Sequence, residues 1–146
     1  MLKVAINNQQ TAHQVNRAQL REGIKRVLTG EGIEKALISI AVVDDETMHR
    51  LNLQYLQHDY PTDVLSFVLE DDARRFEGEI IISADYAARE AQTFGWSAQD
   101  EMLLYAIHGT LHLAGYDDLE PELKSEMRSK EREYLATFGL SPRYDD

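Results

Sequence analysis

The stretch HGTLHLAGYDD, residues 108–118, has the residue types and the spacing of a metal site. His108 and His112 are four residues apart, so on an α-helix both imidazoles project from one face and can bind one ion. Gly115 allows a left-handed turn that would bring residue 118 back towards the histidine pair. Asp118 can then supply a carboxylate oxygen. We therefore expect His108, His112 and Asp118 to hold one divalent metal ion.

The aspartate affects which metal this site would prefer. A carboxylate adds a negative charge that a third neutral histidine would not add, and it makes the ion a weaker Lewis acid. Zinc is the first expectation, and nickel, manganese and iron also suit two imidazoles and a carboxylate. Asp117, Glu120 and His58 are further candidate ligands. The alternative is structural, with His108 as a core histidine and Asp118 as a cap of the last helix.

A helix with two histidines four residues apart also occurs in zincin peptidases. These enzymes need a glutamate directly after the first histidine as general base for the zinc-bound water. That position is Gly109 here, and Glu101 and Glu120 lie outside the required turn. Peptide hydrolysis is therefore disfavoured. A ribonuclease can work without this base, because RNA carries its own nucleophile in the 2′-hydroxyl.

A second polar stretch, DYPTD at residues 59–63, leads directly into an apolar segment. Its simplest interpretation is turn chemistry, in which Pro61 fixes φ while Thr62 and Asp63 hydrogen-bond to their own backbone. The alternative is that Asp63 and the nearby Ser66 line the same site as the metal. Both residues are therefore catalytic candidates without an assigned role.

Charge is unevenly distributed along the 146 residues, whose formal net charge is −11. An acidic chain of this kind is not expected simply to coat nucleic acid. Residues 1–30 nevertheless carry five basic residues against one acidic residue. Arg17, Arg21 and Lys25 repeat every four residues and so share one helix face. This stripe is either a solvated helix face or an RNA-binding surface that contacts phosphates.

The composition and the apolar pattern of the chain also indicate where in the cell the protein is expected. The chain has no cysteine, which excludes disulfides and thiolate metal ligands. It has no signal-peptide pattern at its N-terminus and no apolar run long enough to span a bilayer. We expect a cytoplasmic protein without membrane contact, folded as one domain over residues 1–146.

Hydrophobic periodicity predicts an α+β fold, with a mixed four-stranded sheet packed with about five helices. The helix that carries His108 and His112 would be a zincin-like metal helix. Segment 64–69 could lie parallel to the first two strands, or it could form an antiparallel hairpin with 79–83, because the link between them is short. The predicted strands are 3–7, 36–43, 64–69 and 79–83. The predicted helices are 13–28, 44–56, 83–95, 97–114 and 120–138.

Taken together, these stretches resemble the YbeY family of bacterial rRNA maturation factors, which are proposed single-strand-specific endoribonucleases. The resemblance covers nearly the whole chain in the expected order, and HGTLHLAGYD at 108–117 is its most specific part. Its other residues are Asn52, Tyr55, TDVLSF at 62–67, GEIIIS at 78–83, Met127 and Glu131.

The resemblance implies a mixed four-stranded sheet and a metal held by His108, His112 and residue 118. It further implies a role in 16S rRNA maturation and in quality control of the small ribosomal subunit. The implied partners are ribosomal RNA, the small subunit and ribosome-assembly proteins.

Three positions depart from the family pattern. The third metal histidine is Asp118, and the proline that usually follows the Ser-Phe pair is Val68. An arginine that usually follows the tyrosine at position 55 is Leu56, which cannot make a bidentate phosphate contact. Arg74 or Arg75 could replace that arginine.

Three hypotheses follow for the function. The first is a metal-dependent endoribonuclease acting on rRNA precursors, in which the basic residues of the first helix guide the RNA backbone. The second, motivated by Leu56, Asp118 and the acidic surface, is a ribosome-assembly or binding factor with weakened or lost catalysis. The third is a small metallopeptidase, supported only by the His-His-Asp spacing.

Overall fold

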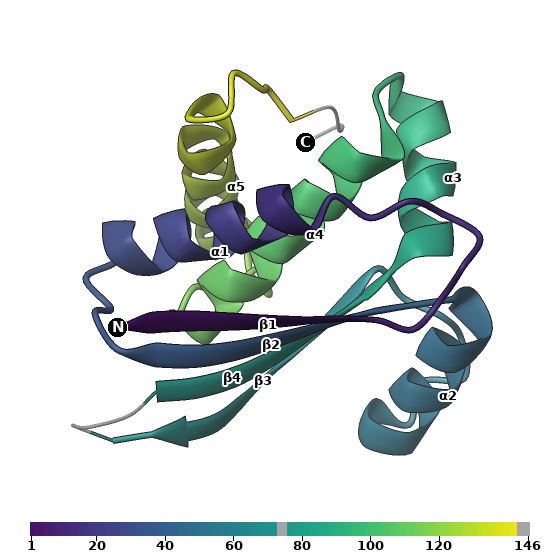
Figure 1. Ribbon diagram of the computed structural model, residues 1–146, viewed down its shortest axis with the longest axis horizontal. Coiled ribbons are helices and arrows are strands. Elements are labelled where there is room, and N and C mark those ends of the chain that lie inside the picture. The colour runs from purple at the N-terminus through teal and green to yellow at the C-terminus, as the bar shows by residue number, and fades with distance from the viewer. Residues whose placement is uncertain (73–75, 143–146) are drawn as a thin grey trace.

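The computed structural model describes residues 1–72 and 76–142, which form a four-stranded sheet and five helices (Figure 1). This confirms the predicted α+β fold with a mixed sheet. The strands are β1 (Leu2–Asn8), β2 (Ala36–Val43), β3 (Val64–Asp71) and β4 (Phe76–Ser83). The helices are α1 (Arg17–Gly30), α2 (Asp45–Leu56), α3 (Ala84–Phe94), α4 (Ala98–Leu113) and α5 (Pro121–Ala136).

The sheet has the strand order β1-β2-β4-β3. β2 pairs in parallel with β1 and with β4, while β3 runs antiparallel to β4 and lies at the edge. Of the two arrangements considered for segment 64–69, the antiparallel hairpin is therefore the one that forms. The reason is the short link between β3 and β4, since a parallel connection needs a crossover of a dozen or more residues. The β3–β4 register shifts between Val68 and Glu70, which marks a bulge in the edge strand.

Helix α4 lies at the centre of the main core. It packs against β3 and β4 and against the helices α1, α3 and α5, which lie on the same side of the sheet (Figure 1). Met102, Leu103, Ile107 and Leu111 of α4 are fully buried there. Helix α2 instead packs on the opposite face, where Met48 contacts a smaller apolar cluster. Among the described residues, no helix combines the length and the apolar character needed to cross a membrane.

The first helix begins later than its apolar periodicity indicated. α1 starts at Arg17, because Asn16 takes the N-cap position and its side chain accepts a hydrogen bond from the Gln19 N–H at 3.1 Å. Residues 13–16 belong to the preceding loop, where His13 Nε2 lies 2.9 Å from Asp85 Oδ1. The last helix, α5, begins one residue later and ends two residues earlier than predicted, with Glu120 as its N-cap.

Gly109 allows α4 to approach the sheet closely. A Cβ atom at this position would lie 2.9 Å from Ile80 Cγ2 and 3.3 Å from Val64 Cγ2. Both neighbours are β-branched strand side chains with little freedom to move aside. The residue after His108 is therefore a glycine for a packing reason, and this spacing fixes the height of His108 above the sheet.

We expect Gly109→Ala to lower the free energy of unfolding by about 1–3 kcal/mol, because the added methyl group overpacks the contact with Ile80. Helix propensity alone predicts the opposite sign, a gain of about 1 kcal/mol. Urea denaturation measures the difference, with Ser129→Ala on an exposed position of α5 as the control. A Gly109→Ala variant more stable than the wild type would show that α4 is not held this closely.

Candidate metal centre

The structure brings His108, His112 and Asp118 together at the C-terminal end of α4. The two Nε2 atoms are 3.1 Å apart. Asp118 Oδ2 lies 3.5 Å from His108 Nε2, and Asp118 Oδ1 lies 3.6 Å from His112 Nε2. Within the described part of the chain, this is the one group of three His, Asp or Glu side chains whose potential ligand atoms all lie within 4.8 Å of one another.

These distances fit a small divalent ion. Four ligands at the usual zinc distances of about 2.0–2.1 Å form a tetrahedron whose edges are about 3.3 Å long. The three observed separations of 3.1, 3.5 and 3.6 Å bracket that value. Three protein ligands leave a fourth position open, which is the arrangement of catalytic rather than structural zinc sites. The three side chains could therefore hold one divalent ion.

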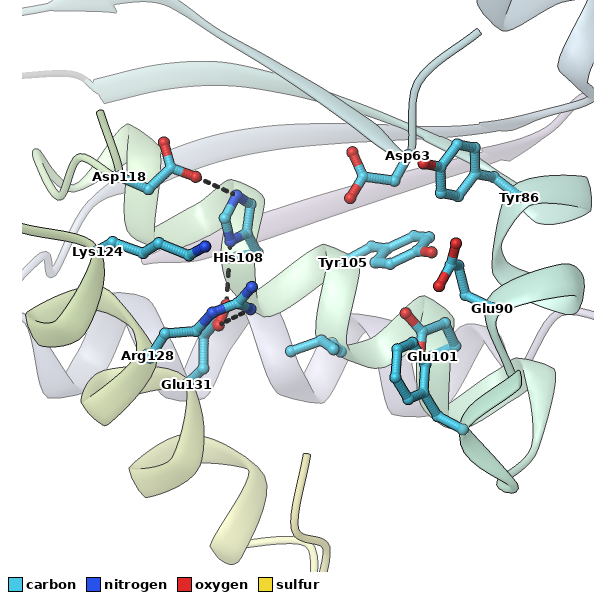
Figure 2. A pocket seen from close by; sticks show the side chains of 12 residues that line it. Asp63, Tyr86, Glu90, Glu101, Tyr105, His108, Asp118, Lys124, Arg128 and Glu131 are labelled. Carbon is cyan, nitrogen blue, oxygen red and sulfur yellow. Dashed lines mark hydrogen bonds and ion pairs between the residues drawn. The ribbon is translucent and has the colours of Figure 1, made fainter. Parts of the chain in front are cut away.

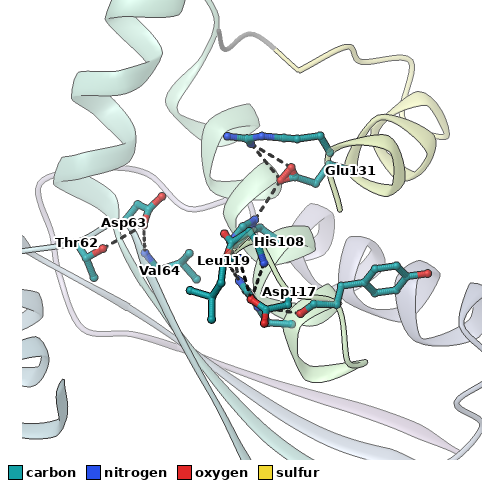
Figure 3. Close-up of polar contacts among 11 residues, drawn as sticks. Thr62, Asp63, Val64, His108, Asp117, Leu119 and Glu131 are labelled. Carbon is teal, nitrogen blue, oxygen red and sulfur yellow. Dashed lines mark hydrogen bonds and ion pairs between the residues drawn. The ribbon is translucent and has the colours of Figure 1, made fainter. Parts of the chain in front are cut away.

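Hydrogen bonds on the far side of each imidazole set the ring orientations. His112 Nδ1 lies 3.0 Å from the carbonyl oxygen of Tyr116, which can only accept, so Nδ1 carries the hydrogen and Nε2 keeps its lone pair. His108 Nδ1 lies 3.1 Å from Glu131 Oε1 (Figure 3). Glu131 is fully buried and also accepts from Arg128 Nη1 at 3.2 and 3.3 Å. A carboxylate that holds a ligand histidine in this way is a usual second partner in metal sites.

The turn after α4 places Asp118. Gly115 has φ +106°, in the region that favours glycine, and the Tyr116 N–H donates to the Leu111 carbonyl at 3.0 Å. Asp117 Oδ1 then accepts from the backbone N–H groups of Asp118 and Leu119 at 2.7 and 3.0 Å (Figure 3). These hydrogen bonds of Asp117 shape the turn, so that Asp118 faces His108 and His112.

Glu31, at the end of α1, anchors the same turn from the other side. Its carboxylate accepts from the Tyr116 hydroxyl at 2.8 Å and from the Tyr134 hydroxyl, and Lys130 Nζ lies 3.7 Å away. Burial opposes ionisation of this carboxyl, but these hydrogen bonds and the lysine charge outweigh it, so the pKa of Glu31 lies below its usual value. The charged form of Glu31 thus ties α1, α5 and the ligand turn together at neutral pH.

A pocket of about 480 Å³ opens beside His108 and Asp118 and has two ends of opposite charge (Figure 2). The cationic end consists of Lys124 and Arg128 on α5, and Arg128 is also paired with the buried Glu131. The acidic end consists of Tyr86 and Glu90 on α3 together with Glu101 and Tyr105 on α4. The remaining lining residues are Asp63, Phe94, Leu104 and Glu131.

The acidic end contains a buried carboxyl group. Glu101 is buried, and its Oε1 accepts a hydrogen bond from Trp96 Nε1 at 2.7 Å. Burial raises the pKa of Glu101 to about 6, although the hydrogen bond from Trp96 opposes the shift. The pKa of the Tyr105 phenol is also raised, first by burial and then by the charges of Glu101, Asp63 and Glu90. Strong shifts of this kind are concentrated at functional sites in proteins.

The other residues singled out in the sequence lie in different places. Asp63 lines the pocket, where its Oδ1 accepts from the Val64 N–H at 2.8 Å, whereas Ser66 is not among the lining residues. His58 stacks on Tyr60 and is exposed, and Glu120 caps α5 without a side-chain hydrogen bond. Neither belongs to the ligand group. Residues Arg17, Arg21 and Lys25 of α1 do not line the pocket, and Arg74 and Arg75 lie outside the described residues.

Sequence reasoning missed the acidic end, although α4 carries a signal for it. Glu101, Tyr105, His108 and His112 follow at intervals of four, three and four residues, which places them on one face. They form a polar stripe on a helix that is otherwise buried. Lys124 and Arg128 were missed because a basic pair four residues apart is common on exposed helices.

Comparison with known proteins identifies relatives over most of the chain. The family model described as Endoribonuclease YbeY matches residues 5–139. An Endoribonuclease YbeY of Salinibacter ruber is 36% identical, covering 95% of this chain and 94% of its own length. Another, from a Sulfurovum species, is 44% identical over 82% of this chain and 80% of its own. The solution structure of a Thermotoga maritima protein shares the fold, with a TM-score of 0.62 and 24% identity over 100% of this chain and 97% of that one.

The raised pKa of Glu101 gives a pH-dependent prediction. The native state holds this proton more tightly than the unfolded state, so stability should fall as pH rises from about 4.5 to about 6. We expect Glu101→Gln to raise the free energy of unfolding by up to about 2 kcal/mol at pH 7.5 and to leave it unchanged at pH 4.5. Urea denaturation at both pH values tests this, with Glu122→Gln on the exposed face of α5 as the control. An equal effect of Glu101→Gln at both pH values would contradict the assignment.

Proposed function

Because the chain belongs to the endoribonuclease YbeY family, we propose that it is a metal-dependent, single-strand-specific endoribonuclease that acts in 16S rRNA maturation and in quality control of the small ribosomal subunit. The observation that carries the proposal is the three-ligand group at the edge of a pocket with a cationic end. Such an arrangement suits the binding of a phosphodiester group.

In this proposal His108, His112 and Asp118 hold one divalent ion, with zinc as the first candidate. A bound ion supplies Lewis-acid stabilisation of negative charge on a phosphoryl oxygen and lowers the pKa of a bound water. Glu131 accepts the Nδ1–H of His108 and keeps its Nε2 directed at the ion. The Tyr116 carbonyl does the same for His112.

Lys124 and Arg128 are the proposed contacts for the scissile phosphate. They lie four residues apart on α5 and line the pocket on the same side as His108 (Figure 2). A lysine ammonium binds phosphate as a point charge, and a guanidinium offers several N–H donors. This pair would take over the role of the arginine that the family usually has where this chain has Leu56. Leu56 itself lies at the end of α2 and does not line the pocket.

Asp63 is the proposed proton acceptor for the 2′-hydroxyl of the RNA. Its carboxyl group points into the pocket between the metal ligands and the acidic end (Figure 2). The hydrogen bonds that Oδ1 accepts from Val64 N and Thr62 Oγ1 hold this side chain in place. Ser66 has no role in this mechanism. Arg17, Arg21 and Lys25 are proposed to contact a longer RNA strand outside the pocket.

A second candidate function is binding to the ribosome or to an assembly protein without catalysis. Leu53, Tyr55 and Leu56 of α2 are 47%, 53% and 41% exposed, which gives this helix an apolar surface suited to a protein partner. Asp118, in contrast, does not argue for inactivity, because its carboxylate lies beside His108 and His112 in a group that could hold a metal ion. One protein could have both RNA cleavage and ribosome binding, and the variant His112→Ala distinguishes the two.

We expect His112→Ala to lower cleavage of single-stranded RNA at least about 100-fold, because a metal ion contributes several kcal/mol of transition-state stabilisation. Elemental mass spectrometry should find about one metal equivalent in the wild type and much less in the variant. A chelator should abolish wild-type cleavage.

The matched control is His58→Ala, which removes an exposed imidazole outside the ligand group and should change neither metal content nor cleavage. RNA cleavage that survives in His112→Ala would contradict the endoribonuclease mechanism. Co-sedimentation with small subunits that survives in this variant, without wild-type cleavage, would favour the binding factor.

Lys124→Gln should weaken RNA binding by about 3- to 10-fold and reduce the slope of log affinity against log salt by about one. The reason is the loss of one phosphate contact while the metal ligands stay in place. Binding of a non-cleavable oligonucleotide at several salt concentrations measures both effects. Lys35→Gln, at an exposed lysine away from the pocket, should leave the slope unchanged, and equal slopes for all three proteins would remove Lys124 from the RNA path.

A further inference from the structure

The acidic end of the pocket is formed by two facing helices. Tyr86 and Glu90 are one turn apart on α3, and Glu101 and Tyr105 are one turn apart on α4, so the four side chains reach a common space (Figure 2). Glu90 and Glu101 are near enough for their charges to raise the pKa of Tyr105. None of these four residues has a part in the phosphate chemistry described above.

The hydroxyl of Tyr105 is the second observation at this end. Tyr105 is only 4% exposed, and its hydroxyl points towards Glu90 (Figure 2). It makes no hydrogen bond of normal geometry to any of the described residues, although Glu101 is close enough to interact with it and to raise its pKa. A buried hydroxyl without a partner is unfavourable and uncommon in folded proteins. The position of the Tyr105 hydroxyl therefore indicates that a bound ligand forms the missing hydrogen bond.

The charges at this end exclude two kinds of ligand. A phosphate would be repelled by the carboxylates of Glu90 and Glu101. A metal ion is disfavoured by spacing, because the described residues offer no second group of three carboxylates or histidines comparable to His108, His112 and Asp118. What fits is a group that presents several N–H donors, and in single-stranded RNA the groups of this kind are the uncharged, planar bases.

Among the RNA bases, guanine has the edge that matches these side chains best. Its N1–H and its 2-amino group are adjacent donors, and a carboxylate is an acceptor that can take two N–H groups at once. Its O6 is an acceptor for a hydroxyl. Adenine and cytosine instead place an acceptor nitrogen beside their amino group, and uracil has one N–H between two carbonyls. Each of these bases would leave a carboxylate facing an acceptor.

We propose that the acidic end is a subsite for an unstacked guanine of single-stranded RNA. Glu90 accepts hydrogen bonds from N1–H and the 2-amino group, the Tyr105 hydroxyl donates to O6, and the Tyr86 ring packs against the base. Aromatic stacking combined with hydrogen bonds to the Watson–Crick edge is the common way of reading single-stranded RNA. The inference rests on the proposed function, since the phosphate attached to this nucleoside would lie at the cationic end of the same pocket.

Guanosine 3′,5′-bisphosphate and inosine 3′,5′-bisphosphate form a matched pair of probes. They differ only in the 2-amino group, and each carries a phosphate on both sides of the sugar, so strand direction does not affect the comparison. Trp96 is the one tryptophan of the chain and donates to Glu101, so its fluorescence reports binding at this end directly. We expect the wild type to bind the guanosine compound at least about tenfold more tightly.

Two variants test the side chains that would read the base. Glu90→Gln replaces an acceptor-only group by an amide, and it should reduce the preference for guanosine to less than about twofold. Tyr105→Phe removes only a hydroxyl that has no partner among the described residues, so it should fold normally and weaken guanosine binding several-fold. The control Glu122→Gln alters an exposed carboxylate of α5 outside the pocket and should leave the preference unchanged.

Equal wild-type affinity for the two nucleotides would overturn the guanine subsite. A preference that persists in Glu90→Gln, or guanosine binding that is unchanged in Tyr105→Phe, would overturn it as well. Cleavage of single-stranded RNA is measured with the same proteins. Cleavage without base discrimination contradicts the subsite and leaves the proposed function intact. Base discrimination that remains in His112→Ala, with cleavage lost, supports both. Discrimination in a wild-type protein that cleaves no RNA supports the subsite and contradicts the nuclease.

Discussion

Helix α4 contacts the sheet so closely at Gly109 that a methyl group would touch Ile80, and the arrangement of the pocket depends on this contact. It fixes the axis and the rotation of the helix that carries His108, His112, Glu101 and Tyr105. The other elements are then placed relative to α4. α3 covers one end of its polar stripe, and α5 covers the other through Glu131 and its hydrogen bond to His108. The candidate metal ligands and the acidic end are therefore positioned by the same helix.

The pocket separates charge within a strongly acidic protein. Lys124 and Arg128 provide positive charge next to the candidate metal ligands, whereas the carboxylates of the acidic end lie further along the same cavity. An RNA strand that enters with its phosphate at the wrong end meets repulsion from Glu90 and Glu101. This separation of charge favours one orientation of a bound nucleotide over the reverse. Repulsion at the acidic end contributes to this preference as much as attraction at the cationic end.

The sequence was sufficient for the order of the elements and for the grouping of His108, His112 and Asp118, because these features are encoded over short distances. Strand periodicity, the i,i+4 histidine pair and Gly115 all act within a few residues of one another. The pocket could not be predicted in the same way, since Tyr86 and Glu90 meet Glu101 and Tyr105 only after two helices have packed. Glu131 was recognised through the family pattern, but its contact with His108 spans 23 residues and depends on where α5 lies. The start of α1 was misplaced because Val15 fits the apolar period, whereas the Asn16 cap decides the boundary.

β3 is an edge strand that pairs with β4 on one side, so a strand of another molecule could pair with its other side. Val68 and Leu69 are exposed on it, and together with the open backbone they would form a template for intermolecular pairing. The bulge between Val68 and Glu70 interrupts the regular spacing of its hydrogen-bonding groups, and Glu70 and Asp71 add charge directly after the apolar pair. A bulge and charges of this kind oppose edge-to-edge pairing, so they counteract the tendency of the exposed apolar pair to join one molecule to the next.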